Sequence, residues 1–171
     1  MTRRIFISYQ NEDRMRAKGF RLMRFNPNVE VDFFDRHLLD PVASHDPNYI
    51  KRCINERMHG TSVTVVLIGN KTHESEWVDY EIQRTLEEGK GLLGIRLKGR
   101  AESIPPGRLT EAGAEVIDWE PADFNDAIDR AARAPLVAGP GLHSVAAPAG
   151  TAAAGGGGGG GSGGCGPRPP P

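Results

Sequence analysis

A regular alternation of β-rich runs and helical patterns is the feature that most constrains the fold of this chain. The third run, SVTVVLIG, is apolar throughout its second half, as is typical of a central strand buried on both faces of a sheet. Alternation of this length indicates an open parallel sheet covered by helices. We therefore predict a flavodoxin-like α/β fold, with five parallel strands and helices on both faces. The five expected strands are residues 4–9, 29–34, 62–69, 91–97 and 114–119.

The segments between these runs carry helix signals of different strength. Residues 46–58 form a helical pattern with Asp46 as the expected N-cap, and residues 75–90 form another with Ser75 as the expected N-cap. The fourth connection, residues 98–113, contains two consecutive prolines. Because proline removes a backbone donor and blocks a helix interior, we expect the fourth helix to be short or absent.

Composition changes abruptly near residue 134. The segment 135–171 holds many of the chain's 22 glycines and 13 prolines and almost no charge. Such a segment cannot bury enough apolar surface to offset the entropy of ordering it. We predict one globular domain over residues 1–134, followed by a disordered Gly/Pro/Ala-rich tail over residues 135–171.

Charge and hydropathy exclude two classes of partner. The formal net charge of −1 provides no basic excess to neutralise phosphates, so we do not expect nucleic acid as a partner. No stretch approaches the ~20 apolar residues of a membrane span, and the first residues run directly into a strand without an apolar signal region. We expect no membrane partner and a cytoplasmic location.

Ligands of open parallel sheets bind beyond the carboxyl ends of the strands, and this rule selects the candidate binding residues. Polar residues follow each of the first three expected strands. Those taken as candidates are Ser8 and Tyr9 after the first, Asp35 and Arg36 after the second, and Asn70 after the third.

Several familiar site types are absent from this edge. There is no GxGxxG between the first expected strand and the helix after it, and no GxxxxGK[ST] anywhere, which argues against a Rossmann dinucleotide site and a P-loop. No GxSxG stands between an expected strand and the helix after it, so a nucleophile elbow is not supported. No pair of the five histidines has helical ligand spacing, and we predict no metal site.

The helix expected at 75–90 places Trp77 and Glu81 one turn apart, beside the apolar stripe that should pack on the sheet. A carboxylate at that rim would be partly shielded from water and would face the expected ligand edge. The simpler interpretation is that Glu81 points into solvent and that Trp77 only packs over the rim, as surface glutamates and aromatics commonly do.

Several separated motifs, in order, resemble a TIR domain. RIFISYQNED (4–13) resembles the first strand and loop, and SEWVDYEI (75–82) resembles the segment with the catalytic glutamate of NAD-consuming TIR enzymes. The stretch 31–95 is similar to the TIR-like subunit of Thoeris antiphage systems. The resemblance covers about residues 3–130 and includes RHLLDPVASHD (36–46), which stands where TIR domains carry an assembly loop but differs from the receptor type.

The resemblance assigns roles to the candidate residues. Glu81 matches the catalytic glutamate, and Trp77 matches the aromatic residue before it. Ser8 and Tyr9 fall in the loop that helps to line the NAD site. Asp35 and Arg36 match positions after the second strand.

The resemblance implies an enzyme that cleaves NAD to a cyclic or linear ADP-ribose signal, in antiphage defence. NAD would be the substrate, with no separate cofactor. Self-association through TIR surfaces and a downstream effector that senses the nucleotide product are the other implied partners. The alternative is a TIR-like interaction module without catalytic activity.

Overall fold

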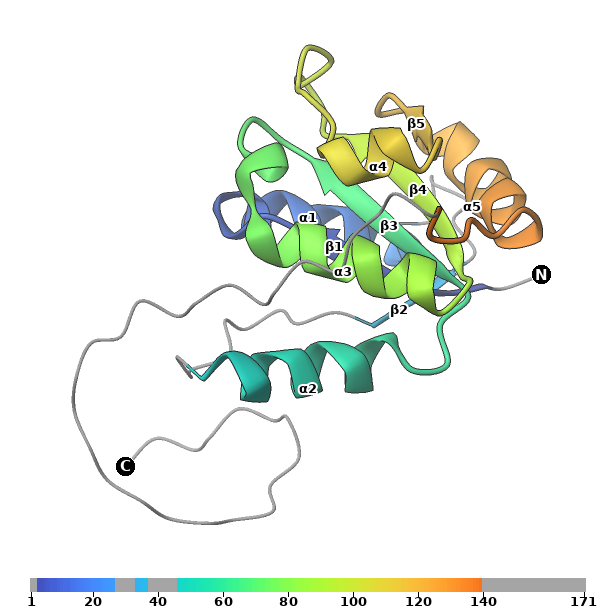
Figure 1. Ribbon diagram of the computed structural model, residues 1–171. Helices are drawn as coiled ribbons and strands as arrows, with labels where there is room; N and C mark the ends of the chain where they lie inside the picture. The colour runs from blue at the N-terminus through green and yellow to red at the C-terminus, as the bar shows by residue number, and fades with distance from the viewer. Residues whose placement is uncertain (1–2, 27–32, 37–45, 140–171) are drawn as a thin grey trace.

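The computed structural model describes residues 3–26, 33–36 and 46–139, in which five strands form one parallel sheet (Figure 1). The strand order is β2-β1-β3-β4-β5. The order reverses between β1 and β3, which is the flavodoxin-like arrangement, so the predicted fold class is confirmed. The strands are β1 (Arg3–Tyr9), β2 (Phe33–Arg36), β3 (Val63–Ile68), β4 (Gly91–Arg96) and β5 (Glu115–Ile117).

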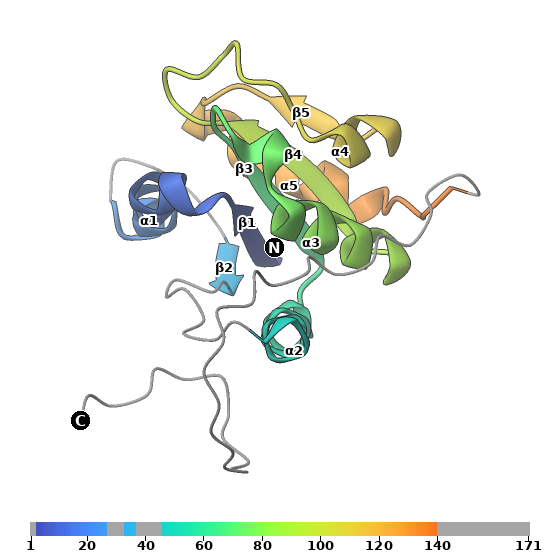
Figure 2. The same ribbon diagram turned by 60° about the vertical axis from the view of Figure 1, so that its left-hand side comes forward.

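Helices cover both faces of this sheet (Figures 1 and 2). On one face α1 and α5 pack against the strands, and on the other face lie α2, α3 and α4. The fourth helix has only five residues, as the two prolines before it predicted. The helices are α1 (Arg14–Leu22), α2 (Pro47–Met58), α3 (Glu76–Glu87), α4 (Gly107–Glu111) and α5 (Phe124–Arg133).

The predicted caps start the two helices on the second face. The carboxylate of Asp46 accepts a hydrogen bond from the backbone N–H of Asn48 at 2.9 Å. The hydroxyl of Ser75 accepts one from the N–H of Val78 at 3.3 Å. Each cap satisfies an N–H that has no partner within its helix, so these residues fix where α2 and α3 begin.

The central strand is buried over its whole length, as its apolar sequence predicted. All six residues of β3 are buried, and successive side chains point to opposite faces. Val65 and Leu67 belong to the core under α1 and α5, whereas Val66 and Ile68 belong to the core under α3 and α4. The sheet is therefore the shared wall of two apolar cores.

The second strand ends later than its sequence suggested. Residues 29–32 of the expected strand lie outside the described residues, whereas Asp35 and Arg36 extend the strand beyond 34. They pair with Ile5 and Phe6 of β1. Strand pairing uses backbone groups, so polar residues continue the ladder as well as apolar ones do. The expectation that Asp35 and Arg36 follow the strand was therefore wrong.

The globular part of the described chain continues slightly past α5. Leu136 is partly buried and packs against the core under α3 and α4. Residues 140–171, which make up most of the expected tail, lie outside the described residues, as does most of the segment 36–46. The division at residue 134 stays a prediction. Within the described residues, no helix has the length and hydropathy needed to cross a membrane.

We predict that Gly91→Ala destabilises the fold, because Gly91 is where the last turn of α5 touches the start of β4. An added Cβ would lie 2.4 Å from the backbone oxygen of Ala131. Since this contact is to backbone, relief requires α5 to move, and we expect a loss of about 1–3 kcal/mol in the free energy of unfolding. Urea denaturation measures this loss.

Gly107→Ala is the matched control, since an added Cβ there meets no atom within 4 Å. Equal unfolding free energies for the two variants would contradict the close packing of α5 on β4.

Candidate active site

Glu81 lies on the inner side of α3, not at its solvent rim. The predicted apolar stripe of this helix is buried, with Val78, Ile82 and Leu86 in one core cluster. Glu81 is next to Ile82 in the chain and is itself only 8% exposed. The interpretation in which Glu81 points into solvent is therefore excluded. A glutamate this deeply buried needs a hydrogen-bond partner or must give up its charge.

Ser8 of β1 provides the hydrogen bond to this carboxyl group. Its hydroxyl donates to Oε2 of Glu81 at 2.5 Å, and Ser8 is 1% exposed. Strand alternation explains the placement, because Ile5 and Ile7 face the core under α1 and α5, which leaves Ser8 on the α3 face. Two residues that are 73 positions apart in the chain are thus joined inside the protein.

Burial changes the acidity of Glu81. Desolvation penalises the charged form and raises the pKa of Glu81 from 4.5 to about 8, while the hydrogen bond from Ser8 acts in the opposite direction. At neutral pH the carboxyl group of the free protein is therefore mostly protonated. A carboxyl group whose pKa is shifted this far by its surroundings, next to the ligand-binding edge of the sheet, is a candidate catalytic group.

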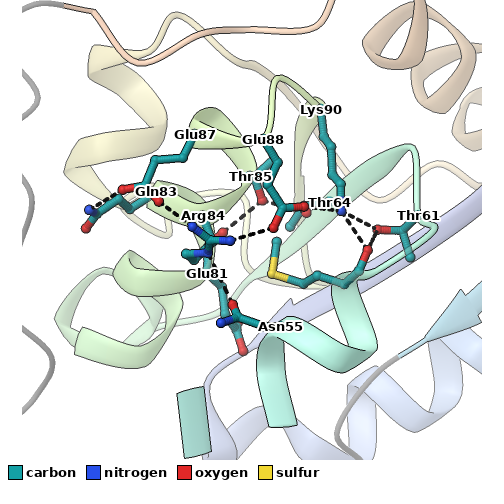
Figure 3. A network of polar contacts seen from close by, with 11 residues as sticks. Asn55, Thr61, Thr64, Glu81, Gln83, Arg84, Thr85, Glu87, Glu88 and Lys90 are labelled. Atoms are coloured by element: carbon teal, nitrogen blue, oxygen red, sulfur yellow. Dashed lines mark hydrogen bonds and ion pairs between the residues drawn. The ribbon is translucent and has the colours of Figure 1, made fainter. Parts of the chain in front are cut away.

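Two buried threonines continue the polar contacts one turn further along α3 from Glu81 (Figure 3). The hydroxyl of Thr85 donates to the backbone oxygen of Glu81 at 2.8 Å, and its Oγ1 lies 2.6 Å from Oγ1 of Thr64 on β3. A hydroxyl has one hydrogen, so Thr64 must be the donor to Thr85. This pair ties the Glu81 turn of α3 to the central strand.

A second network holds the C-terminal half of α3 against α2 (Figure 3). Arg84 donates to the side chain of Asn55 at 3.1 Å and to Glu88 at 2.7 Å. Lys90 bonds Glu88 at 2.6 Å and donates to the backbone oxygen of Met58 at 2.6 Å, at the C-terminal end of α2. A cation at that end also suits the helix dipole. The turn that carries Glu81 is thus held to the central strand, and the part of the chain that follows it is held to α2.

Trp77 is half-buried and packs on the α2 side of α3. Its ring meets that of Tyr80 edge to face, with centroids 5.9 Å apart. Both rings lie on a cluster with Phe6 and Ile54. This is the rim-packing arrangement that the sequence left open as the simpler interpretation. A role for Trp77 in the NAD site, which its match to the aromatic residue of TIR enzymes implies, stays a prediction.

The structure does not bring Tyr9 to Glu81. The Tyr9 side chain packs against the core under α1 and α5, on the opposite face of the sheet from Ser8. Asn70 is exposed in the turn after β3. For Asp35 and Arg36 the structure describes the backbone pairing with β1. Of the predicted binding residues whose side chains are described, Ser8 is the one that bonds Glu81.

Sequence reasoning assigned no role to Asp13, a buried carboxylate at the same edge. Asp13 is 5% exposed and bonds Arg16 at 3.0 Å. Its carboxylate lies so close to Gly69, at the end of β3, that a Cβ there would be 1.9 Å from an Asp13 oxygen. A glycine directly after a buried strand was the available signal for such a close approach. The contact holds the loop after β1 against the end of β3.

We predict that Glu81 makes the protein less stable as the pH rises from 4.5 to 8. Its folded-state pKa lies above the unfolded value, so the folded protein binds the extra proton in this window and stability falls with increasing pH. The total loss should be on the order of a few kcal/mol. Urea denaturation of the parent and of Glu81→Gln across this range measures it, because the variant cannot ionise and should lack this loss.

Glu76→Gln, at an exposed position on the same helix, is the control and should follow the parent. Parallel stability curves for the parent and Glu81→Gln would contradict the burial of an ionisable group at this position.

Comparison with known proteins places this chain in a family. The chain is 27% identical over 124 residues to a Bacillus cereus (strain MSX-D12) protein named "Putative cyclic ADP-D-ribose synthase ThsB1". The alignment covers 70% of this chain and 63% of that relative, so the chain spans less than two thirds of the relative's length. A family model described as "Thoeris protein ThsB, TIR-like domain" matches residues 6–102, which is more than half of the chain and includes Ser8, Trp77 and Glu81. The chain therefore belongs to the family of Thoeris ThsB proteins with a TIR-like domain.

Proposed function

We propose that this protein cleaves NAD at the bond between nicotinamide and ribose, with Glu81 as the catalytic residue. The proposal rests on the buried pair of Ser8 and Glu81, in which the carboxyl group is held against the sheet by a hydrogen bond. The family model of the TIR-like domain matches the part of the chain that contains both residues. The name of the Bacillus cereus relative, a cyclic ADP-D-ribose synthase, supports the same substrate.

The reaction suits a single carboxylate. The nicotinamide of NAD is cationic, so it leaves as a neutral molecule when the bond from C1′ of the ribose breaks and its electron pair moves to the ring nitrogen. The ribose is left with oxocarbenium character, as in glycoside hydrolysis. A carboxylate in a water-poor site stabilises that developing positive charge more strongly than it could in water.

The raised pKa of Glu81 links the ionisation of its carboxyl group to substrate binding. In the free protein burial favours the neutral form, with a pKa of about 8. A cationic nicotinamide near the carboxyl group favours the ionised form, because a nearby opposite charge lowers the pKa of an acid. Glu81 therefore becomes a carboxylate when the positive charge that it stabilises is present. Ser8 donates to the carboxylate and keeps it oriented.

The product depends on which nucleophile reaches C1′. Attack by water, with loss of its proton, gives linear ADP-ribose, and attack by an adenine nitrogen gives a cyclic product. The relative's name favours the cyclic product. In this proposal NAD is the substrate, no separate cofactor takes part, and the nucleotide product is the signal for a downstream effector in antiphage defence. Self-association through TIR surfaces belongs to the same proposal.

We predict that Glu81→Gln abolishes NAD cleavage and leaves the fold intact, since the substitution removes the charge at nearly constant volume. Purified full-length protein is incubated with NAD, together with any known trigger, and the nucleotides are identified by mass analysis. The parent should release nicotinamide together with cyclic or linear ADP-ribose, and Glu81→Gln should release at least ~100-fold less, as expected when a main electrostatic group is removed.

Glu76→Gln serves as the matched control, because it makes the same chemical change at an exposed position of α3. Its turnover should equal that of the parent. Undiminished turnover by folded Glu81→Gln would contradict the site assignment. A parent that neither binds nor cleaves NAD would favour the interaction module instead.

A further inference from the structure

The loop between β4 and α4 holds polar groups that the proposed reaction does not use. It projects beyond the end of β4, at the edge of the sheet where the strands have their carboxyl ends (Figure 1). Two successive turns shape it, with the N–H of Arg100 donating to the Leu97 oxygen at 2.8 Å and the N–H of Ser103 donating to the Arg100 oxygen at 3.0 Å. The second turn brings Arg100 and Ser103 close together as its first and last residues.

Both of these residues bury a polar atom that has no partner among the described residues. The hydroxyl of Ser103 is buried without a hydrogen bond, in a residue that is only 9% exposed. The Nε of Arg100 is likewise buried and without a bond. Leaving such a group unbonded costs about 1–3 kcal/mol, more for a charged group, so two in one turn require an explanation.

The chemistry of the two groups indicates what would satisfy them. A guanidinium Nε–H donates, and a serine hydroxyl can donate as well, so the complementary ligand is rich in acceptor oxygens. A phosphoryl group has such oxygens and a negative charge, which arginine binds through charge-assisted hydrogen bonds. Lys98 in the loop and Arg96 at the end of β4 add positive charge. Glu102 opposes it, and Arg96 forms an ion pair with Asp118 at 3.3 Å. The local balance favours an anion.

We propose that Arg100 and Ser103 form a phosphoryl-binding site, in which the guanidinium and the hydroxyl donate to oxygens of one phosphate group. The site uses residues other than Ser8 and Glu81, and its test does not depend on NAD cleavage. Its ligand is either a free phosphate or pyrophosphate anion or the diphosphate of a nucleotide such as ADP-ribose. These sources share the chemistry and differ in the rest of the molecule.

A purely structural role would leave a different pattern. The hydroxyl of a serine with a purely structural role would form a hydrogen bond with a neighbouring carbonyl or N–H, and loss of that hydroxyl would destabilise the protein. Ser103 makes no such bond. Removing an unbonded buried hydroxyl should therefore leave the stability of the fold unchanged or raise it, while any ligand that used the hydroxyl is bound less tightly.

The test is calorimetric titration of the full-length protein with inorganic pyrophosphate and, separately, with ADP-ribose, at low ionic strength. The parent should bind at least one of them saturably. Arg100→Gln and Ser103→Ala should each weaken binding about tenfold, the effect of losing one charge-assisted hydrogen bond. Lys98→Gln is the matched control, because it removes one positive charge from the same loop at an exposed position and should weaken binding less than twofold.

Thermal unfolding of Ser103→Ala provides the second readout, and its melting temperature should match or exceed that of the parent. Tighter binding of ADP-ribose than of pyrophosphate would support the site with a nucleotide as the source, and equal binding would support it with a free anion. Equal losses in Arg100→Gln and Lys98→Gln would overturn the proposal, as would absence of saturable binding to both anions, or a destabilised Ser103→Ala that binds like the parent.

Discussion

The hydrogen bond between Ser8 and Glu81 is the interaction on which the proposed site depends. It joins β1 to α3 across the inside of the protein and is the one described side-chain bond to the Glu81 carboxyl group. Burial alone would keep this group neutral, and the bond from Ser8 counteracts that effect without cancelling it, which leaves a pKa of about 8. A carboxyl group in this range is easily converted to a carboxylate by a cationic ligand, whereas a fully solvated glutamate would already be charged and less effective.

The rest of the fold keeps this pair in place. The cap at Ser75 sets where α3 begins, and the Thr64–Thr85 contact anchors the turn that carries Glu81 to the central strand. Further along the helix, Arg84 and Lys90 tie α3 to the end of α2. Positioning a catalytic group requires such fixed surroundings, because small displacements reduce the rate strongly. A buried ionisable group also lowers the free energy of unfolding, so keeping Glu81 at this position makes the fold less stable.

Much of this structure could be predicted from sequence because it rests on local chemistry. The apolar run that became β3, the caps at Asp46 and Ser75 and the prolines before α4 each act within a few residues. Helical periodicity also placed Glu81 beside the buried stripe, although the sequence suggested a rim position and the structure shows a deeply buried one. The depth depends on how α3 packs against β1, the strand that carries Ser8, and periodicity within one helix carries no such information.

The same limit explains the other differences. Ser8 and Tyr9 are neighbours in sequence and both follow from the strand-edge rule, yet alternation along β1 sends their side chains to opposite faces of the sheet. Asp35 and Arg36 are polar, as residues after a strand tend to be, but backbone pairing with β1 continues through them. The contact of Asp13 with Gly69 needs two loops to meet, and only the assembled sheet brings them together.

The most direct test of this account is the titration of the Glu81 carboxyl group itself, followed by the ¹³C chemical shift of the side-chain carboxyl carbon in labelled protein. In the parent the group should titrate with a pKa of about 8. In Ser8→Ala it should titrate at a higher pH, because the bond that favours the charged form is gone. Titration of Glu81 near its ordinary value of 4.5, with no change in Ser8→Ala, would contradict the buried pair as the basis of the site.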